Sequence, residues 1–231
     1  MSELDTFHTE GHDDITGLVL SGGGARAAYQ VGVLHQLAKW FEQENKREFD
    51  FPFKILCGTS AGAINAAALA CAGRNFYQST DRMLKVWENF SSDQVFRSDS
   101  LGIIRTGARW LSALSIGWML RKRPKCLLDN SPLSHLMHQL LHFRRLDEAL
   151  ENGTIHALAV TASSYSSGRS VTFFQTQKVI ESWARTQRVA LPDRITVEHL
   201  LASAAIPFVF PAVKLNIEGR MEHFGDGSIR Q

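Results

Sequence analysis

The sequence predicts an α/β fold, because two apolar segments near the N-terminus each run through a glycine-rich turn into a helical segment. The first of these units occupies 15–41 and the second occupies 53–71. A strand that passes through a tight turn into a helix is the repeating unit of α/β proteins, in which helices pack on a sheet. We therefore expect one domain built around a sheet.

The composition of the 231-residue chain fits that expectation. It is 44% hydrophobic and 21% charged, which is typical of a globular domain. The formal net charge of +2 produces no field that would attract nucleic acid, so no nucleic-acid partner is expected. Residues 1–14 form a polar tail without the features of a secretory signal, and no run reaches the roughly 18 apolar residues of a membrane span. With three cysteines in no paired spacing, these features favour a cytoplasmic protein.

The turn of the first unit has the features of an anion-binding site. Gly22, Gly23 and Gly24 precede the helical spacing of 28–41, so several backbone N–H groups can converge at the positive end of a helix. One interpretation is a dinucleotide site, with an acidic residue about 20 positions further on to bind a ribose. The other is an oxyanion hole, in which the same amides stabilise the charge on an attacked carbonyl oxygen.

The second unit has the pattern of a nucleophile elbow. Such a turn exposes the serine Oγ above the sheet, and the flanking Gly58 and Gly62 are needed because a Cβ would collide with the adjacent strand or helix. Ser60 is therefore the candidate nucleophile, the alternative being an ordinary loop serine. A nucleophilic serine next to an anion-binding turn forms a coherent acyl-transfer site. A dinucleotide-binding fold has no use for such a serine. The hydrolase interpretation is therefore favoured.

Further along, the chain is expected to alternate helices and strands. Amphipathic spacing predicts a surface helix over 76–90, and Pro132 suits the first turn of another helix. The remaining expectations are strands at 154–161 and 171–174, a helix at 197–205 that stops before Pro207, and a strand-like run within 208–217.

The segment 101–125 differs from the rest because it is basic and rich in tryptophan and aliphatic residues. It contains six Lys or Arg residues and no acid. Apolar groups beside cations suit a segment that contacts an anionic membrane surface reversibly, which would make the protein peripheral to the membrane. The alternative is a helix that caps the core and has a solvated basic end.

Asp226 lies between two glycines after a strand-like run, where a carboxylate can be aimed by a tight turn. Alone, this pattern is better explained as a plain turn. Four blocks together are more specific, and 22–27, 58–62, 202–211 and 226–228 resemble those of the patatin-like phospholipase family, in the same order. The resemblance covers about residue 15 to the end.

This resemblance implies a three-layer α/β/α sandwich with a mainly parallel central sheet. It also implies a lipid acyl hydrolase of the phospholipase A or lysophospholipase type, acting on a phospholipid or another acyl ester without a metal or other cofactor. The domain would occupy 15–231 and would be truncated at its C-terminal end, as a fragment or a naturally short form. Ala27 and Ser228 depart from the family pattern, which usually has Gly and Gly or Ala there.

Carried over residue by residue, the resemblance assigns a Ser-Asp dyad in which Asp226 is the base for Ser60. It assigns the oxyanion hole to Gly22, Gly23, Gly24 and Arg26, and the nucleophile elbow to Gly58 and Gly62.

Two other kinds of protein stay open beside the dinucleotide-binding oxidoreductase. A Ser-His-Asp esterase could use Asp193 with His199 or His223, and a catalytically inactive protein could bind lipid without cleaving it. The nine histidines show no metal-ligand spacing.

Overall fold

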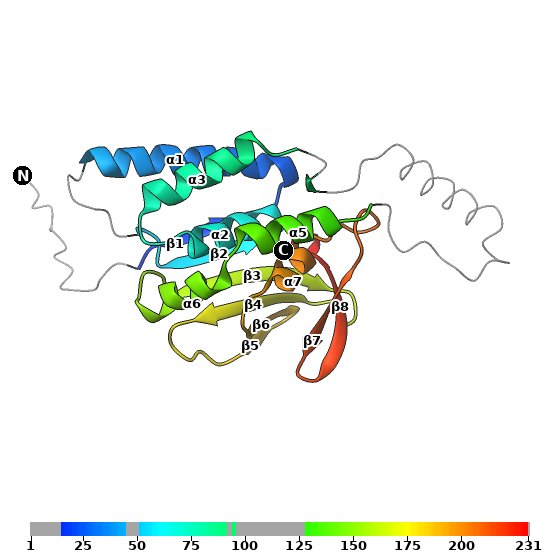
Figure 1. Ribbon diagram of the computed structural model, residues 1–231. Helices are drawn as coiled ribbons and strands as arrows, with labels where there is room; N and C mark the ends of the chain where they lie inside the picture. The colour runs from blue at the N-terminus through cyan, green and yellow to red at the C-terminus, as the bar shows by residue number, and fades with distance from the viewer. Residues whose placement is uncertain (1–14, 45–50, 92–93, 96–127, 231) are drawn as a thin grey trace, which may run out of the picture.

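The computed structural model describes residues 15–44, 51–91, 94–95 and 128–230 (Figure 1). Its helices are α1 (Ala27–Glu44), α2 (Ala61–Cys71), α3 (Phe76–Glu88), α5 (Ser131–Leu140), α6 (Phe143–Glu151) and α7 (Val197–Ser203). Its strands are β1 (Gly17–Leu20), β2 (Ile55–Thr59), β3 (Ala157–Ser164), β4 (Ser170–Thr176), β5 (Trp183–Arg185), β6 (Arg188–Pro192), β7 (Val213–Ile217) and β8 (Arg220–Asp226). Short 3-10 helices occupy Gly24–Arg26 and Gly227–Arg230.

The strands form one sheet in the order β1-β2-β3-β4-β6-β5, to which β8 adds by pairing with β3, and β7 by pairing with β8. The strand β3 has two partners along one edge. Its first part pairs with β2 as far as Thr59 opposite Thr161, and its last part pairs with β8 from Asp226 opposite Ala162. The end of β2 and the end of β8 therefore meet on the same edge of β3.

The sheet is mixed, which corrects the expectation of mainly parallel pairing. Parallel pairs are β1 with β2, β2 with β3 and β4 with β6, whereas the other four pairs are antiparallel. The turn between β3 and β4 is too short for the crossover that a parallel pair requires, so these strands form a hairpin. The same argument applies to β5 with β6 and to β7 with β8.

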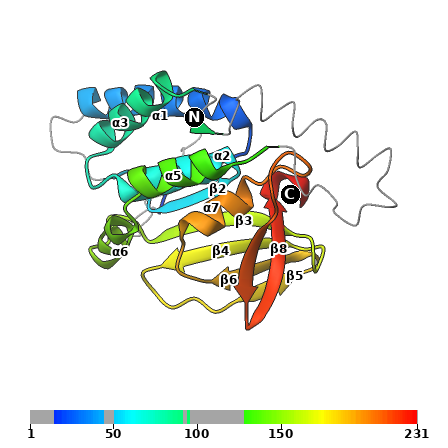
Figure 2. The same cartoon turned by 45° about the vertical axis from the view of Figure 1, so that its right-hand side comes forward.

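The helix α2 is the centre of the packing. It contacts β2 and β3 on one side and α1, α3 and α6 elsewhere, and the views of Figures 1 and 2 show it between the sheet and the pair formed by α1 and α3. Its alanines Ala63, Ala66 and Ala67 are fully buried, as are Leu56 and Leu158 of the strands below. Small side chains allow this helix to lie close to the sheet. With helices packed on a central sheet, the predicted α/β sandwich class is confirmed.

Most predicted elements occur within a few residues of their expected positions. The exceptions are α6, β5, β6 and β8, for which no element was predicted, and the basic segment 101–125, which lies outside the described residues. Among the helices of the described ranges, none is long and apolar enough to cross a membrane.

Candidate active site

Ser60 and Asp226 are brought together by the edge of β3. Ser60 follows the last residue of β2, and Asp226 is the last residue of β8. The Ser60 Oγ donates a hydrogen bond of 2.6 Å to Asp226 Oδ2, and each residue is 6% exposed. A short bond from a hydroxyl to a carboxylate is charge-assisted and therefore strong. The two residues assigned to the dyad thus form a direct pair across 166 positions of sequence.

The turn that carries Ser60 is strained and tightly enclosed. Ser60 has a φ of 55° and a ψ of −130°, a conformation that residues with a Cβ rarely adopt. A Cβ on Gly62 would lie 2.2 Å from the backbone oxygen of Leu20, and one on Gly58 would lie 2.4 Å from the Cα of Ala63. Both flanking positions therefore require glycine because backbone atoms occupy the space.

Ser203 is a residue whose contact with the elbow the sequence did not reveal. It is fully buried at the end of α7, where its Oγ accepts a 2.8 Å hydrogen bond from the Ser60 backbone N–H. The same Oγ donates a 2.6 Å bond to the carbonyl oxygen of Thr161. Ser203 therefore joins the strained turn to β3 and holds Ser60 in its unusual conformation.

The turn of Asp226 is fixed by backbone hydrogen bonds. The Asp226 N–H donates to the carbonyl oxygen of Ala205, 2.8 Å away, just beyond α7. Its Oδ1 accepts a 2.8 Å bond from the Ser228 N–H, which leaves Oδ2 directed at Ser60. The carboxylate is therefore aimed at the hydroxyl by two separate contacts.

The glycine turn lies directly beside the pair. A Cβ on Gly22 would lie 3.0 Å from the Cβ of Ser60 and 2.4 Å from Ser228 Oγ. Gly24 has a φ of +53°, and nothing lies within 4 Å of the position that its Cβ would take. Among the backbone hydrogen bonds of the described residues, none uses the N–H of Gly22 or Gly23 as a donor, whereas the Arg26 N–H donates to the Gly23 carbonyl oxygen at 3.1 Å.

A second residue that the sequence did not reveal, Asn65, holds this turn in place. It is buried in α2, and its Nδ2 donates a 3.0 Å hydrogen bond to the carbonyl oxygen of Ala27, which begins α1. Its Oδ1 accepts a 3.1 Å bond from Trp87 Nε1 of α3. A single amide thus fixes the start of α1 relative to α2 and α3.

The histidines considered for a Ser-His-Asp triad have other contacts. His199 Nδ1 accepts a bond from the Thr196 N–H, and Nε2 lies 3.4 Å from Asp193 Oδ2. Burial lowers the pKa of His199, although Asp193 and Glu198 act in the opposite direction. His223 on β8 is exposed, and among the described residues its side chain forms no hydrogen bond to Ser60 or Asp226. In the described parts of the chain, Ser60 Oγ forms a hydrogen bond with the Asp226 carboxylate alone.

Tyr165 is a titratable side chain that packs against Gly225, the residue before Asp226. A Cβ on Gly225 would collide with its hydroxyl and the adjoining ring carbons, so the hydroxyl end of the ring lies directly against that glycine. Burial raises the pKa of Tyr165, and the nearby Asp226 carboxylate raises it further. The phenol is therefore protonated at neutral pH.

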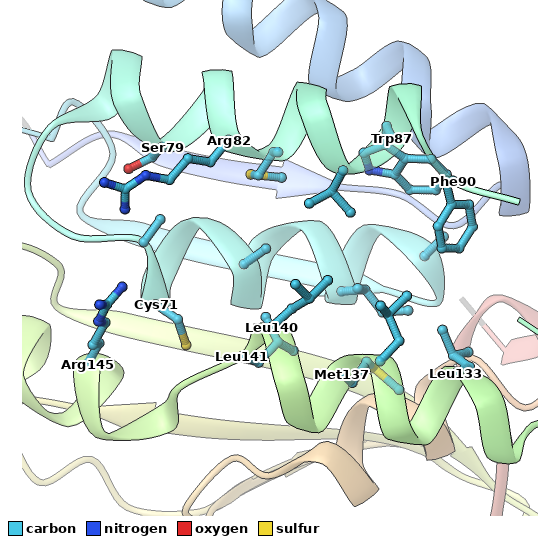
Figure 3. Close-up of a pocket in the computed structure, with 17 residues that line it drawn as sticks. Cys71, Ser79, Arg82, Trp87, Phe90, Leu133, Met137, Leu140, Leu141 and Arg145 are labelled. Atoms are coloured by element: carbon cyan, nitrogen blue, oxygen red, sulfur yellow. The ribbon is translucent and has the colours of Figure 1, made fainter. Parts of the chain in front are cut away.

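An apolar groove follows α2 from Ala61, the residue after Ser60 (Figure 3). It has a volume of about 250 Å³, with α2 as its floor and α3 and α5 as its walls. Ala61, which follows Ser60, lines the near end together with Phe90 and Leu133, and Cys71 lines the far end. The groove is lined largely by aliphatic and aromatic side chains. In the ranges that the structure describes, no group of three or more His, Cys, Asp or Glu residues is arranged to hold a metal ion.

One protein family matches most of this chain. The family model described as Patatin-like phospholipase matches residues 18–231. A search of curated proteins gives no match.

Among solved structures, VipD from Legionella pneumophila is similar at 15% identity, with a TM-score of 0.51, covering 94% of this chain and 46% of that chain. The type III effector protein ExoU is similar at 18% identity and a TM-score of 0.41, covering 82% of this chain and 39% of that chain. The ExoU-SpcU complex of Pseudomonas aeruginosa matches at 21% identity and a TM-score of 0.35, with 85% and 37% covered. The chain thus spans less than half the length of these structures, and the first likeness shows the shared fold.

Proposed function

Because the chain belongs to the patatin-like phospholipase family, we propose that it is a serine acyl hydrolase that cleaves fatty-acyl esters of lipids through a Ser60–Asp226 dyad. The observation that carries this proposal is the 2.6 Å hydrogen bond from Ser60 Oγ to Asp226 Oδ2 on a strained, glycine-flanked turn. Membership of the family supports the lipid acyl hydrolase activity, and the geometry supports the dyad.

In the proposed reaction, Asp226 Oδ2 takes the proton of Ser60 Oγ as that oxygen forms a bond to the ester carbonyl carbon. The tetrahedral intermediate then breaks its bond to the alcohol oxygen, which leaves with the proton held by Asp226. Water repeats the cycle on the acyl-enzyme, giving its proton to Asp226 and releasing the fatty acid as the Ser60 hydroxyl re-forms. A carboxylate already bonded to the hydroxyl needs no histidine as an intermediary.

The oxyanion is proposed to bind at the glycine turn. The N–H groups of Gly22 and Gly23 have no backbone partner in the described residues, and they lie at the start of the 3-10 helix that leads into α1. The Ser60 N–H is engaged by Ser203 and so is not a free donor. Because the Arg26 N–H is used within the turn, Arg26 would contribute through the charge of its guanidinium group. Donors of this kind are each typically worth about 10²–10³ in rate.

The groove supports a substrate with a long apolar chain. A fatty-acyl chain attached to Ser60 can enter at Ala61 and run between α3 and α5, where each methylene removed from water is stabilised by about 0.8 kcal/mol. Short soluble esters would use only its near end.

Labelling with a fluorophosphonate tests the proposed nucleophile, because this reagent modifies activated serines. We expect the parent protein to be labelled, Ser60→Ala to be unlabelled, and Asp226→Asn to be labelled far more slowly. Ser134→Ala on α5 is a matched control that should be labelled like the parent. Equal labelling of Ser60→Ala and the parent would contradict the assignment.

The basic segment 101–125 is proposed to bring the enzyme to anionic membranes, although it lies outside the described residues. Each Lys or Arg near an anionic surface contributes roughly 1 kcal/mol. Replacing Arg121, Lys122, Arg123 and Lys125 with Gln should therefore weaken sedimentation with anionic vesicles and leave activity on a soluble ester unchanged. If that variant sedimented as well as the parent does, the segment would instead be a cap over the core.

A further inference from the structure

Two arginines lie at the far end of the groove, away from Ser60. Arg82 of α3 and Arg145 of α6 both line the groove near Cys71, the last residue of α2, and Figure 3 shows both guanidinium groups at this end. Both side chains are exposed, so this end opens to solvent. The groove is therefore apolar along its length and cationic at its far opening.

Neither guanidinium group has an acidic partner among the described residues, although acids are paired close by. On α3, Asp81 forms an ion pair with Lys85 at 2.8 Å rather than with Arg82. On α6, Glu148 pairs at 3.3 Å with Arg144, the neighbour of Arg145. In both helices the outward-facing cation is paired and the arginine that lines the groove is not.

Asp147 is the acid that acts most directly on this region, because its charge raises the pKa of Cys71 while that of Arg145 lowers it. However, Asp147 is already bound by Arg194 at 2.6 Å and by Gln175 at 2.8 Å. Its charge is therefore compensated by other residues. The two groove arginines together present positive charge at this opening, and neither forms an ion pair with an acid of the described chain.

The position of this charge restricts which anion can reach it. From Ala61 to Cys71, α2 extends about 15 Å at 1.5 Å per residue. In a phospholipid the phosphate lies about five bonds from the ester carbonyl, which is at most roughly 7 Å with bonds near 1.5 Å. With the ester at Ser60, the headgroup phosphate therefore falls well short of the arginines. An extended acyl chain advances about 1.25 Å per carbon at such bond lengths and angles, so about 12 carbons span the groove.

We propose that Arg82 and Arg145 bind a carboxylate at the far end of the acyl chain, so that the enzyme selects esters of ω-carboxylated fatty acids of about 12 carbons. This inference rests on the proposed function, because it places the ester at Ser60. Planar guanidinium groups match a carboxylate well, and two of them can hold it from opposite sides of the opening. The apolar walls between the ester and the arginines would exclude chains whose carboxylate falls short of the far end.

The test compares two p-nitrophenyl esters that differ only at the chain end: the dodecanoate, which ends in a methyl group, and the monoester of dodecanedioic acid, which ends in a carboxylate. We expect the ratio of kcat/KM for the carboxylated ester to that for the methyl-ended ester to fall by about tenfold in Arg82→Gln/Arg145→Gln, since partly exposed ion pairs contribute a few-fold each. Arg144→Gln is the matched control, because this neighbouring arginine pairs with Glu148 outside the groove and its loss should leave the ratio unchanged.

Chain length gives a second expected result. For the monoester of hexanedioic acid, the carboxylate would stop inside the apolar part of the groove, so the same double variant should not alter its ratio to the methyl-ended hexanoate. If the double variant left the dodecanedioate ratio unchanged, or changed both lengths equally, the proposal would be overturned. Equal change at both lengths would indicate a general electrostatic attraction by the arginines.

A binding measurement separates this inference from the proposed reaction. Calorimetry with Ser60→Ala protein should show tighter binding of dodecanedioate than of dodecanoate, and the preference should disappear when both arginines are Gln. Inorganic phosphate should compete only weakly, because it lacks the chain that fills the groove. If the parent protein lacked esterase activity but showed this binding preference, the proposed dyad would be contradicted and the arginine site would be supported. If it showed activity without the preference, the arginine site would be contradicted and the dyad would be supported.

Discussion

In the turn between β2 and α2, glycine is required by the backbone around it, whereas at Gly24, in the turn between β1 and α1, it is required by a dihedral angle. A Cβ at Gly62 would meet the backbone oxygen of Leu20 at 2.2 Å, while a Cβ at Gly24 would meet nothing within 4 Å. Gly24 instead has a φ of +53°. The turn between β2 and α2 is therefore enclosed and fixes the nucleophile, whereas the turn between β1 and α1 is open at Gly24. One small site thus combines a rigid turn that holds Ser60 with a second turn that is less enclosed.

The strongest test of the enclosed turn is Gly62→Ala. No flexible side chain can move aside, because the atoms in the way belong to the backbone of β1. We expect a loss of stability of about 4 kcal/mol or more, in the range of severe core disruption, and little soluble protein. Urea unfolding measures the effect. Gly32→Ala is the control, since Gly32 lies in α1 with nothing within 4 Å, and it should gain roughly 0.5–1 kcal/mol.

Removing the Ser203 hydroxyl, which supports the same turn, should reduce stability less than Gly62→Ala does. Ser203→Ala leaves the Ser60 N–H buried without its partner, which costs about 1–3 kcal/mol. Because the φ of Ser60 is strained, we also expect kcat to fall while the KM for a short ester stays nearly constant. Ser79→Ala removes another buried hydroxyl, which donates to the carbonyl oxygen of Asn75 just before α3, and should spare kcat on the same short ester. A Ser203→Ala protein with parental kcat would show that the turn holds its shape unaided.

In the open turn, Gly24→Ala should cost only about 1–2 kcal/mol, the penalty for placing a Cβ in the left-handed region. Gly24→Asn should cost less, because asparagine tolerates this conformation better. Both variants should fold, and thermal unfolding followed by circular dichroism can rank them. If Gly24→Ala were as damaging as Gly62→Ala, the proposed difference between the two turns would not hold.

Acidification should produce the smallest change in stability. It should act through His199 of α7, the helix whose Ser203 supports the enclosed turn. Burial lowers the pKa of His199 below its ordinary value of 6.5, so the folded state prefers the neutral ring. The stability from this preference is complete above pH 6.5 and is lost as the pH falls from there through the lower pKa of the folded state. Urea midpoints between pH 7.5 and 5 should therefore fall more steeply for the parent than for His199→Gln. Parallel slopes would exclude this residue as a source of the pH dependence.

The local parts of this structure could be predicted from sequence because their signals are local. Glycines at fixed spacing after apolar runs indicate a strand, a turn and a helix within about twenty residues, and both such units occur where they were expected. By contrast, β5 and β6 are short, and their sequences carry little periodicity. The mixed pairing of the sheet also depends on turn lengths, which the approximate boundaries of the strands did not define.

Within the candidate site, the contacts between Ser203 and the elbow and between Asn65 and the start of α1 could not be predicted. Ser203 lies 143 positions from Ser60 and Asn65 lies 38 positions from Ala27, so neither contact leaves a pattern in a short window. Both are bonds from one polar side chain to a backbone group, and a serine or asparagine in an apolar helix has many possible partners. Only the folded sheet determines which partner is used.

The separation of Ser60 from Asp226 has a consequence for how the protein becomes active during folding. Residues near the start of the chain form the strained turn, but the carboxylate arrives only when β8 docks beside β2 along β3. Contacts between such distant positions form slowly, since the loop between them must first close. Until then the serine has an ordinary hydroxyl, so a growing or partly unfolded chain would not attack the lipids around it. Ester hydrolysis would then report on completion of the sheet, and its recovery after dilution from urea would time the docking of the last strand.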